Sequence, residues 1–254
     1  MKTTHYTTAV DVHVAGEMFR VIEHSPTEGV HSSVADYKND CLANDEYQRL
    51  VREPRGHKDM NLCVLTPPVH EQSTAGVVAF RGTLSNCHSP SAYLAAVAYL
   101  KEVRGQTGNF RLDGAEGSVD VIDKGEELTL LIDNDSTIKR VDADFQLSAN
   151  TLWKVDQFYE DHRGKDQTWR YLVLKDQEGT FVGVESDGHI DRSPLSVAMT
   201  APHSGKVQNF LGNTIHVECE ENGRLRLTAK PMISTLSRFT VDPTDPMKDG
   251  FLIK

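Results

Sequence analysis

The stretch RGTLSNCHSPSAYLAAVAYL, residues 81–100, decides the fold that we expect. An apolar run over residues 76–80 predicts a strand, and a loop then leads into a helix. Ser89 is placed to be the N-cap and Pro90 the first helical residue, where its missing N–H removes no hydrogen bond. One helical face is apolar, and Gly105 marks the end of the helix. That face consists of Ala92, Ala95, Ala96, Tyr99 and Leu100.

The start of this helix has two interpretations. A strand that leads into a buried helix N-terminus directs backbone N–H groups at a small anion, such as the carboxylate of a substrate. The alternative is a capped helix of the core, with Ser89 in a purely structural role. This stretch taken alone favours the structural interpretation.

Composition limits the class of protein. The chain has 254 residues, enough for one large domain or two compact ones. A formal net charge of −10 argues against a nucleic-acid partner, because no basic surplus could neutralise phosphates. No apolar run is long enough for a membrane span, and the first residues lack the apolar core of a signal peptide. We therefore expect a cytoplasmic protein with no nucleic-acid or membrane partner; a homodimer is compatible with the sequence.

The cysteines and histidines do not form a recognisable metal motif. The four cysteines have no Cys-x-x-Cys spacing, which argues against both a zinc knuckle and a disulfide framework. Two short spacings, His13 with Glu17 and His57 with Asp59, could ligate a metal, but such pairs are more often hydrogen-bonded polar residues. We predict no metal.

Hydropathy alternation predicts a chain rich in strands. The patterns predict two strands around a turn at residues 15–17, a helix over Asp45–Arg52 capped by Asn44, and a helix over Leu152–His162. A hairpin is expected around residues 177–179, and another with a type I′ turn at Asn222-Gly223. With three helices at most, the fold class is α+β. Further strands are expected at residues 62–65, 75–80, 110–112, 118–122, 127–132, 169–175, 180–185, 214–219, 224–229, 236–241 and 251–253.

The segment EPRGHKDM, residues 53–60, resembles a motif of the proline racemase family. This family includes hydroxyproline epimerases and trans-3-hydroxyproline dehydratases. Further matches follow the family's order along nearly the whole chain. They are DVHVAGEMFR at residues 11–20, the strand from Gly76 into the opening stretch, IDRSP at residues 190–194, and a C-terminal signature from Phe239 through DP at 242–243, DP at 245–246 and GF at 250–251.

The resemblance implies a diaminopimelate-epimerase-like fold, in which two similar halves each wrap a sheet around a central helix. We expect residues 1–117 with 236–254 to form the first half and residues 118–235 the second. It also implies an active site between the halves, with a small-molecule substrate and no cofactor. There, two opposed cysteines remove and return the Cα proton while helix N-termini hold the carboxylate.

The departures from the family pattern change the expected chemistry. The family's first cysteine falls on Ser89, and its second on Leu195, which cannot carry a proton. The aspartate that usually contacts the substrate amine is His189, and the glycine-rich helix start that normally follows the second cysteine is lost from Ser196 onwards. Pro202 soon follows, so we expect the second central helix to be shortened.

Neighbouring polar groups are the candidates to replace the thiols. We name Ser89, His88 and His189 as catalytic candidates, since imidazole is a suitable base near neutral pH. The substrate-binding candidates are His57, Asp59, Pro90, Ser91, Asp191, Leu195 and Ser196.

Three functions stay open at this point. The first is a divergent isomerase, lyase or cyclase, acting in the cleft on a molecule other than free proline. The second is a proline or hydroxyproline racemase, epimerase or dehydratase, in which Cys87 acts. The third is a binding protein that kept the fold and lost the chemistry.

Overall fold

The structure is a computed structural model of the whole chain. It describes residues 5–24, 30–57, 60–80, 89–133, 139–141, 154–161, 169–175, 181–185, 190–191, 193–200, 204–209 and 211–251.

The chain divides into two compact units. Unit 1 comprises Met1–Val14, Met18–Leu128 and Pro231–Lys254, and unit 2 comprises Ala15–Glu17 and Thr129–Lys230. The predicted division, with boundaries after residue 117 and before residue 236, stays a prediction.

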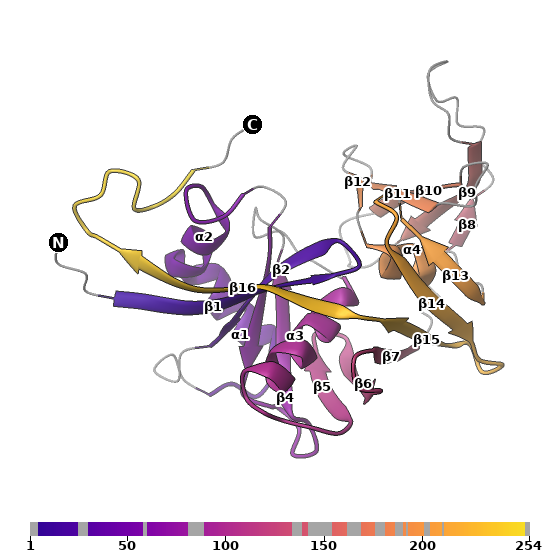
Figure 1. The fold of residues 1–254 in the computed structure, drawn as a ribbon, viewed down its shortest axis with the longest axis horizontal. Helices are drawn as coiled ribbons and strands as arrows, with labels where there is room; N and C mark the ends of the chain where they lie inside the picture. The colour runs from indigo at the N-terminus through magenta and orange to yellow at the C-terminus, as the bar shows by residue number, and fades with distance from the viewer. Residues whose placement is uncertain are drawn as a thin grey trace. The chain divides into compact units, whose positions relative to one another are not determined.

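Unit 1 is a mixed sheet with three helices (Figure 1). Its strands lie in the order β6-β5-β4-β3-β2-β1-β16, with β2/β3 and β4/β5 parallel. The long last strand, β16, runs antiparallel beside β1 and joins the two ends of the sequence. The elements are β1 (His5–Val14), β2 (Glu17–Glu23), α1 (Val34–Ala43), α2 (Asp45–Val51), β3 (Asn61–Thr66), β4 (Ala75–Phe80), α3 (Ser91–Glu102), β5 (Phe110–Gly114), β6 (Gly117–Asp123) and β16 (Pro231–Val241).

The helices of unit 1 cover opposite faces of this sheet. Successive side chains of a strand point to opposite faces. In β3, Leu62 and Val64 belong to the hydrophobic cluster formed with residues of α1 and α2. The intervening Cys63 faces α3 instead, because its Sγ donates a hydrogen bond to the carbonyl of Ala92 at 3.7 Å.

Helix α3 is the central helix of unit 1, as predicted. It contacts β1, β3, β4, β6 and β16, which include both ends of the strand order, so the sheet curves around it. Its burial extends beyond the predicted apolar face to most of its length. At its end, Gly105 has a φ of +66° and donates its N–H to the carbonyl of Lys101 at 3.1 Å, which closes the last turn.

Unit 2 holds a short helix and strands of two groups. One group has the order β13-β14-β15-β7, and the other β12-β11-β10-β9-β8. Helix α4 contacts strands from both groups and is shorter than α3, as predicted. The elements are β7 (Leu128–Asp133, of which Leu128 belongs to unit 1), β8 (Lys139–Val141), β9 (Lys154–Asp161), β10 (Trp169–Lys175), β11 (Phe181–Glu185), β12 (Ile190–Asp191), α4 (Pro194–Thr200), β13 (Gly205–Gln208), β14 (Thr214–Cys219) and β15 (Arg224–Ala229).

Two helix predictions are wrong. The helix expected over Leu152–His162 is strand β9, which pairs antiparallel with both β8 and β10; sheet pairing here overrides local preference. Helix α1 was not predicted, and with it the described part of the chain has four helices, not three at most. Its signal is a cap, since Ser33 Oγ accepts a hydrogen bond from the Asp36 N–H at 3.1 Å.

The β14–β15 hairpin is where it was predicted, but its turn is of another type. Gly223 has a φ of +85°, whereas Asn222 does not have the positive φ that a type I′ turn needs. Gly223 donates its N–H to the carbonyl of Glu220 at 2.9 Å, and Glu220 donates to the carbonyl of Arg224 at 2.8 Å. This pattern is a type I turn followed by a glycine bulge.

Candidate functional site

The start of α3 is buried and closed by its own hydrogen bonds. Ser89 is 7% exposed and Ser91 0%. Ser89 Oγ accepts a hydrogen bond from the Ser91 N–H at 3.3 Å, and the Ser89 carbonyl accepts one from the Ala92 N–H at 3.1 Å. Pro90, and not Ser89, is the N-cap residue by backbone geometry, so the predicted cap is one position off; its φ of −62° is already helical. Because Pro90 has no side-chain acceptor, the Ser89 hydroxyl still supplies the capping bond.

These bonds limit what the helix start can bind. The N–H groups of Ser91, Ala92 and Tyr93 all have acceptors within the turn, the last being the carbonyl of Pro90 at 3.2 Å. Pro90 has no N–H to offer. A carboxylate near this end of α3 therefore needs donors from side chains rather than from the first backbone N–H groups.

Tyr93 lies in the first turn of α3, after the N-cap residue Pro90. Its hydroxyl lies against Gly114, where an added Cβ would be 2.0 Å from Tyr93 Oη. The pKa of Tyr93 is raised to about 12. Burial is the largest cause, followed by the charge of Glu116 and the nearby Cys63 thiol. The phenol therefore stays protonated at neutral pH.

Glu116 connects this tyrosine to a lysine. It lies in the turn between β5 and β6, and its negative charge acts on both Tyr93 and Lys38 of α1. The pKa of the Lys38 ammonium is lowered by burial, and the charge of Glu116 offsets part of that effect. Sequence reasoning did not select Tyr93, Glu116 or Lys38.

The N-terminal motif at residues 11–20 forms a structural centre of unit 1. Arg20 donates two hydrogen bonds to the Asp11 carboxylate, at 2.7 and 2.8 Å, and both residues are buried. The same guanidinium donates to the carbonyls of Leu50 and Arg55 and lies 4.3 Å from the ring centroid of Phe239. Residues of three matched motifs thus meet at Arg20.

The motif at residues 53–60 packs against the C-terminal signature. Glu53 and Phe251 exchange two backbone hydrogen bonds of 2.9 Å. A Cβ at Gly56 would lie 2.6 Å from the Val51 backbone, and Gly250 has a φ of +70° with a Cβ position 2.9 Å from the Glu53 carbonyl. Both glycines are required by space or conformation, so these motifs hold the fold together.

Of the two pairs His13/Glu17 and His57/Asp59, both histidines lie within the described residues. His57 accepts a hydrogen bond from the Met60 N–H on its carbonyl, at 2.9 Å. Its predicted partner Asp59 lies outside the described residues. His13 is half-buried, and its Nδ1 has no hydrogen-bond partner in the described part of the chain.

The candidate residues of unit 2 lie around the start of α4. Asp191 is in β12, and Leu195 and Ser196 are in the first turn of the helix. Leu195 is 0% exposed, as a core residue is. His189 and, in unit 1, His88 lie outside the described residues. The structure therefore groups Ser89, Pro90 and Ser91 in unit 1, and Asp191, Leu195 and Ser196 in unit 2.

A buried carboxylate outside the candidate set organises the loop between β3 and β4. Asp113 is 1% exposed and accepts hydrogen bonds from the N–H groups of Val69 and His70 and from the hydroxyls of Ser73 and Ser118. Burial alone would raise the pKa of Asp113, but the bonds from Ser73, His70 and Val69 outweigh it and hold the pKa well below its usual range.

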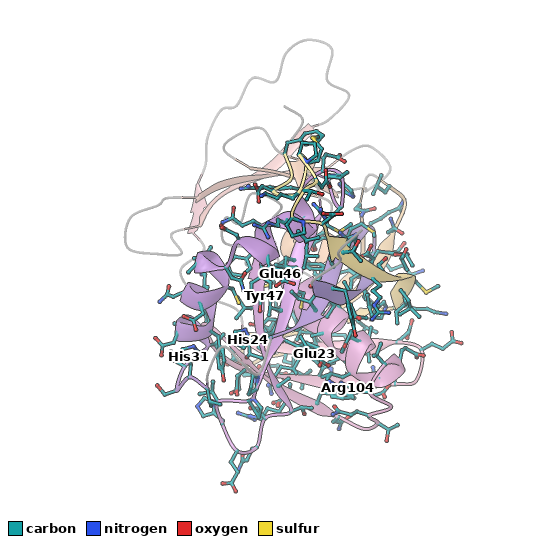
Figure 2. All side chains as sticks on the ribbon, turned by 90° about the vertical axis from the view of Figure 1, so that its left-hand side faces the viewer. Glu23, His24, His31, Glu46, Tyr47 and Arg104 are labelled. Atoms are coloured by element: carbon teal, nitrogen blue, oxygen red, sulfur yellow. The ribbon has the colours of Figure 1, made fainter. Side chains whose placement is uncertain are left out.

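Two further histidines belong to an aromatic cluster between β2 and the helices α1 and α2. The rings of His24 and His31 meet the ring of Tyr37 edge-on, at centroid distances of 5.1 and 4.8 Å. His24 Nδ1 shares a hydrogen bond of 3.2 Å with the Tyr47 hydroxyl, and Figure 2 labels His24, His31 and Tyr47 of this cluster. We assign this cluster to packing.

The described residues contain neither a cluster of metal ligands nor a membrane-spanning helix. Within the described ranges, no three His, Cys, Asp or Glu side chains gather in a way that could hold a metal ion. No helix in that part of the chain combines the length and apolarity of a membrane span.

Comparison with known proteins identifies relatives of this chain. Residues 9–131 match the family described as proline racemase. Trans-3-hydroxy-L-proline dehydratase of Bacillus thuringiensis subsp. konkukian is 23% identical over 100% of both chains. Two similar folds are a hydroxyproline epimerase of Agrobacterium vitis with bound trans-4-hydroxy-L-proline (TM-score 0.72, 15% identity, 100% of this chain and 96% of the other) and a phenazine biosynthesis protein of the PhzF family from Enterococcus faecalis (TM-score 0.61, 12% identity, 92% and 99%).

These folds confirm the predicted diaminopimelate-epimerase-like α+β arrangement. The family match over residues 9–131 contains three of the sequence motifs quoted above, and the dehydratase match extends over the rest of the chain. The predicted resemblance to the proline racemase family is confirmed by the match over residues 9–131.

Proposed function

We propose that this chain is a cofactor-independent lyase or isomerase that breaks the Cα–H bond of a small carboxylate other than free proline. The observation that carries the proposal is the pair of positions where the family resemblance expects thiols. One is Ser89, buried at the start of α3, and the other is Leu195, buried in the core of unit 2. A leucine cannot transfer a proton, so a mechanism with two opposed thiols is excluded at these positions.

A single base is sufficient for β-elimination, whereas stereoinversion needs a proton donor on the opposite face. A serine hydroxyl ionises far above neutral pH, so Ser89 needs an adjacent base to act. His88 precedes it in sequence, and imidazole is the side chain best suited to that role near pH 7. We therefore favour elimination, with His88 or His189 as the base and Ser89 as a hydroxyl that positions the substrate.

The first alternative is a typical hydroxyproline dehydratase or epimerase. The full-length similarity to trans-3-hydroxy-L-proline dehydratase supports it, and Cys87 would then be the base. The second alternative is a binding protein without turnover. The buried Leu195, which cannot transfer a proton, supports this alternative.

The test is Cα proton exchange in D2O, followed by NMR, with trans-3-hydroxy-L-proline, trans-4-hydroxy-L-proline and L-proline offered separately. Exchange of a hydroxylated substrate that is lost in His88→Ala or His189→Ala but kept in Cys87→Ala supports the proposal. His216→Ala is the matched control, because His216 is an exposed residue of β14. Exchange that depends on Cys87 favours the first alternative. A substrate-dependent rise in melting temperature without exchange favours the second.

A further inference from the structure

We propose that strand β16 is the interface for a second copy of this chain, which adds its own β16 antiparallel to the unpaired side of the strand. The resulting dimer is symmetric, with Leu236 of one copy opposite Leu236 of the other. The interface belongs to unit 1 and does not depend on the proposed function.

Strand β16 is a long edge strand. It is the last strand in the sheet order, and in the described part of the chain it pairs with β1 only. A bulge at Ser234, whose hydroxyl donates to the Asp11 carbonyl at 3.0 Å, interrupts this pairing once. Residues 235–241 then pair with β1 without a break. The backbone groups on the far side of such an edge are a template for a further strand.

The sequence of this edge has little of the usual protection against another strand. Proteins place lysine, proline or an inward-pointing charge on long edge strands to prevent pairing. Residues 235–241, TLSRFTV, contain one charged side chain, Arg238, and no proline. Arg238 is directed back over β1, with its Cζ 3.4 Å from the ring centroid of Tyr6. The formal net charge is −10, so a strand without acidic residues is a favourable place for two copies to approach.

An exposed leucine lies in the middle of this strand. Leu236 is 73% exposed, although its partner in β1, Val10, is 1% exposed and belongs to the core. The apolar face of the sheet therefore continues to its last strand and is exposed to solvent there. Burial of this side chain against another strand is favourable, because it removes apolar surface from water.

Symmetry selects the second copy and the register. A two-fold axis through Leu236 pairs the strand with itself, with the two leucines opposite each other and Thr235 opposite Ser237 on both sides of the axis. Arg238 then faces Ser234, so no like charges meet. A register centred on Arg238 would instead place two guanidinium groups opposite each other, which is unfavourable.

The experiment places charges at the symmetry axis. Leu236→Lys and Leu236→Glu are made in the full chain, and analytical ultracentrifugation measures the mass of the wild type, of each variant and of their equimolar mixture. Leu211→Lys and Leu211→Glu are the matched controls, because Leu211 is a 49% exposed leucine of unit 2. Circular dichroism checks that every variant is folded.

We expect the wild type to have twice the mass of one chain. Each Leu236 variant alone should dissociate with a Kd higher by about tenfold or more, because like charges meet and the leucine contact is lost. The mixture should recover the dimer, since opposite charges then face each other, and the Leu211 variants should stay dimeric. A wild type that is monomeric at all concentrations overturns the proposal, as does a dimer that both Leu236 variants leave intact.

Leu236→Cys tests the register directly. It is made in a Cys219→Ser background, because Cys219 is exposed. Directly opposed residues of paired strands have Cβ atoms about 4.5–5.5 Å apart, so a small shift brings two cysteines within reach of a disulfide. Mild oxidation should link most chains into dimers and leave the Cys219→Ser parent unlinked. A dimeric protein that forms no such link overturns the pairing through Leu236.

Discussion

Gly114→Ala tests the position of the Tyr93 hydroxyl. A Cβ at this position would lie 2.0 Å from Tyr93 Oη, 3.0 Å from Tyr93 Cζ and 3.0 Å from the Gly117 carbonyl. Gly114 is not among the glycines with positive φ, so the backbone tolerates alanine and the steric conflict is mainly with the hydroxyl. Overpacking of this kind lowers the free energy of unfolding by about 1–3 kcal/mol.

Tyr93→Phe removes the oxygen that the new methyl group would meet. In that background, Gly114→Ala should lower stability by clearly less, because only the contacts at 3.0 Å remain. The coupling between the two substitutions should therefore exceed roughly 0.5 kcal/mol, the usual limit of additivity for independent sites.

The assay is urea unfolding of the wild type, both single variants and the double variant, followed by circular dichroism. Equal destabilisation by Gly114→Ala in the tyrosine and phenylalanine backgrounds would refute the placement of the Tyr93 hydroxyl.

Three further predictions concern stability. Asp11→Asn should lower the free energy of unfolding by about 3–5 kcal/mol, because it leaves the buried Arg20 without its anion. Urea unfolding of the double variant Asp11→Asn/Arg20→Met is the check. Its loss of stability should be smaller if the uncompensated charge is the cause. The pKa of Asp113 is lower in the folded than in the unfolded protein, where it is near 4, so the ionised carboxylate stabilises the fold above about pH 4. This stabilisation is lost as the pH falls toward the folded pKa. The acid unfolding of Asp113→Asn should therefore depend less steeply on pH than that of the wild type. Ser89→Ala should lower the free energy of unfolding by about 1 kcal/mol through loss of the capping bond to Ser91, and an unchanged urea midpoint would contradict that bond.

The fold of unit 1 could be predicted largely because its signals are local. The apolar runs of β3 and β4 and the apolar helix after Ser89, which ends before Gly105, each correspond to one element of the structure. Strand β9 could not be identified in this way, because its conformation is determined by pairing with β8 and β10 rather than by its own residues.

The candidate site was less predictable, because similar motifs serve different purposes. Asp11 and Arg20 belong to a motif that resemblance associates with the family, yet their contacts are those of a buried ion pair that supports α2 and the loop at Arg55. Tyr93, Glu116 and Lys38, which influence one another's pKa, come from three separate segments, so no single sequence motif contains them.

The loss of both thiol positions bears on which reaction the proposed function can include. A racemase needs a proton carrier on each face of Cα, and Leu195 cannot be one of them. Ser89 at the other position needs an adjacent base, so under the proposed function the removal of the Cα proton depends on His88 or His189. Elimination needs only that one base, whereas stereoinversion needs a second proton carrier. For this reason the proposed function favours elimination over inversion.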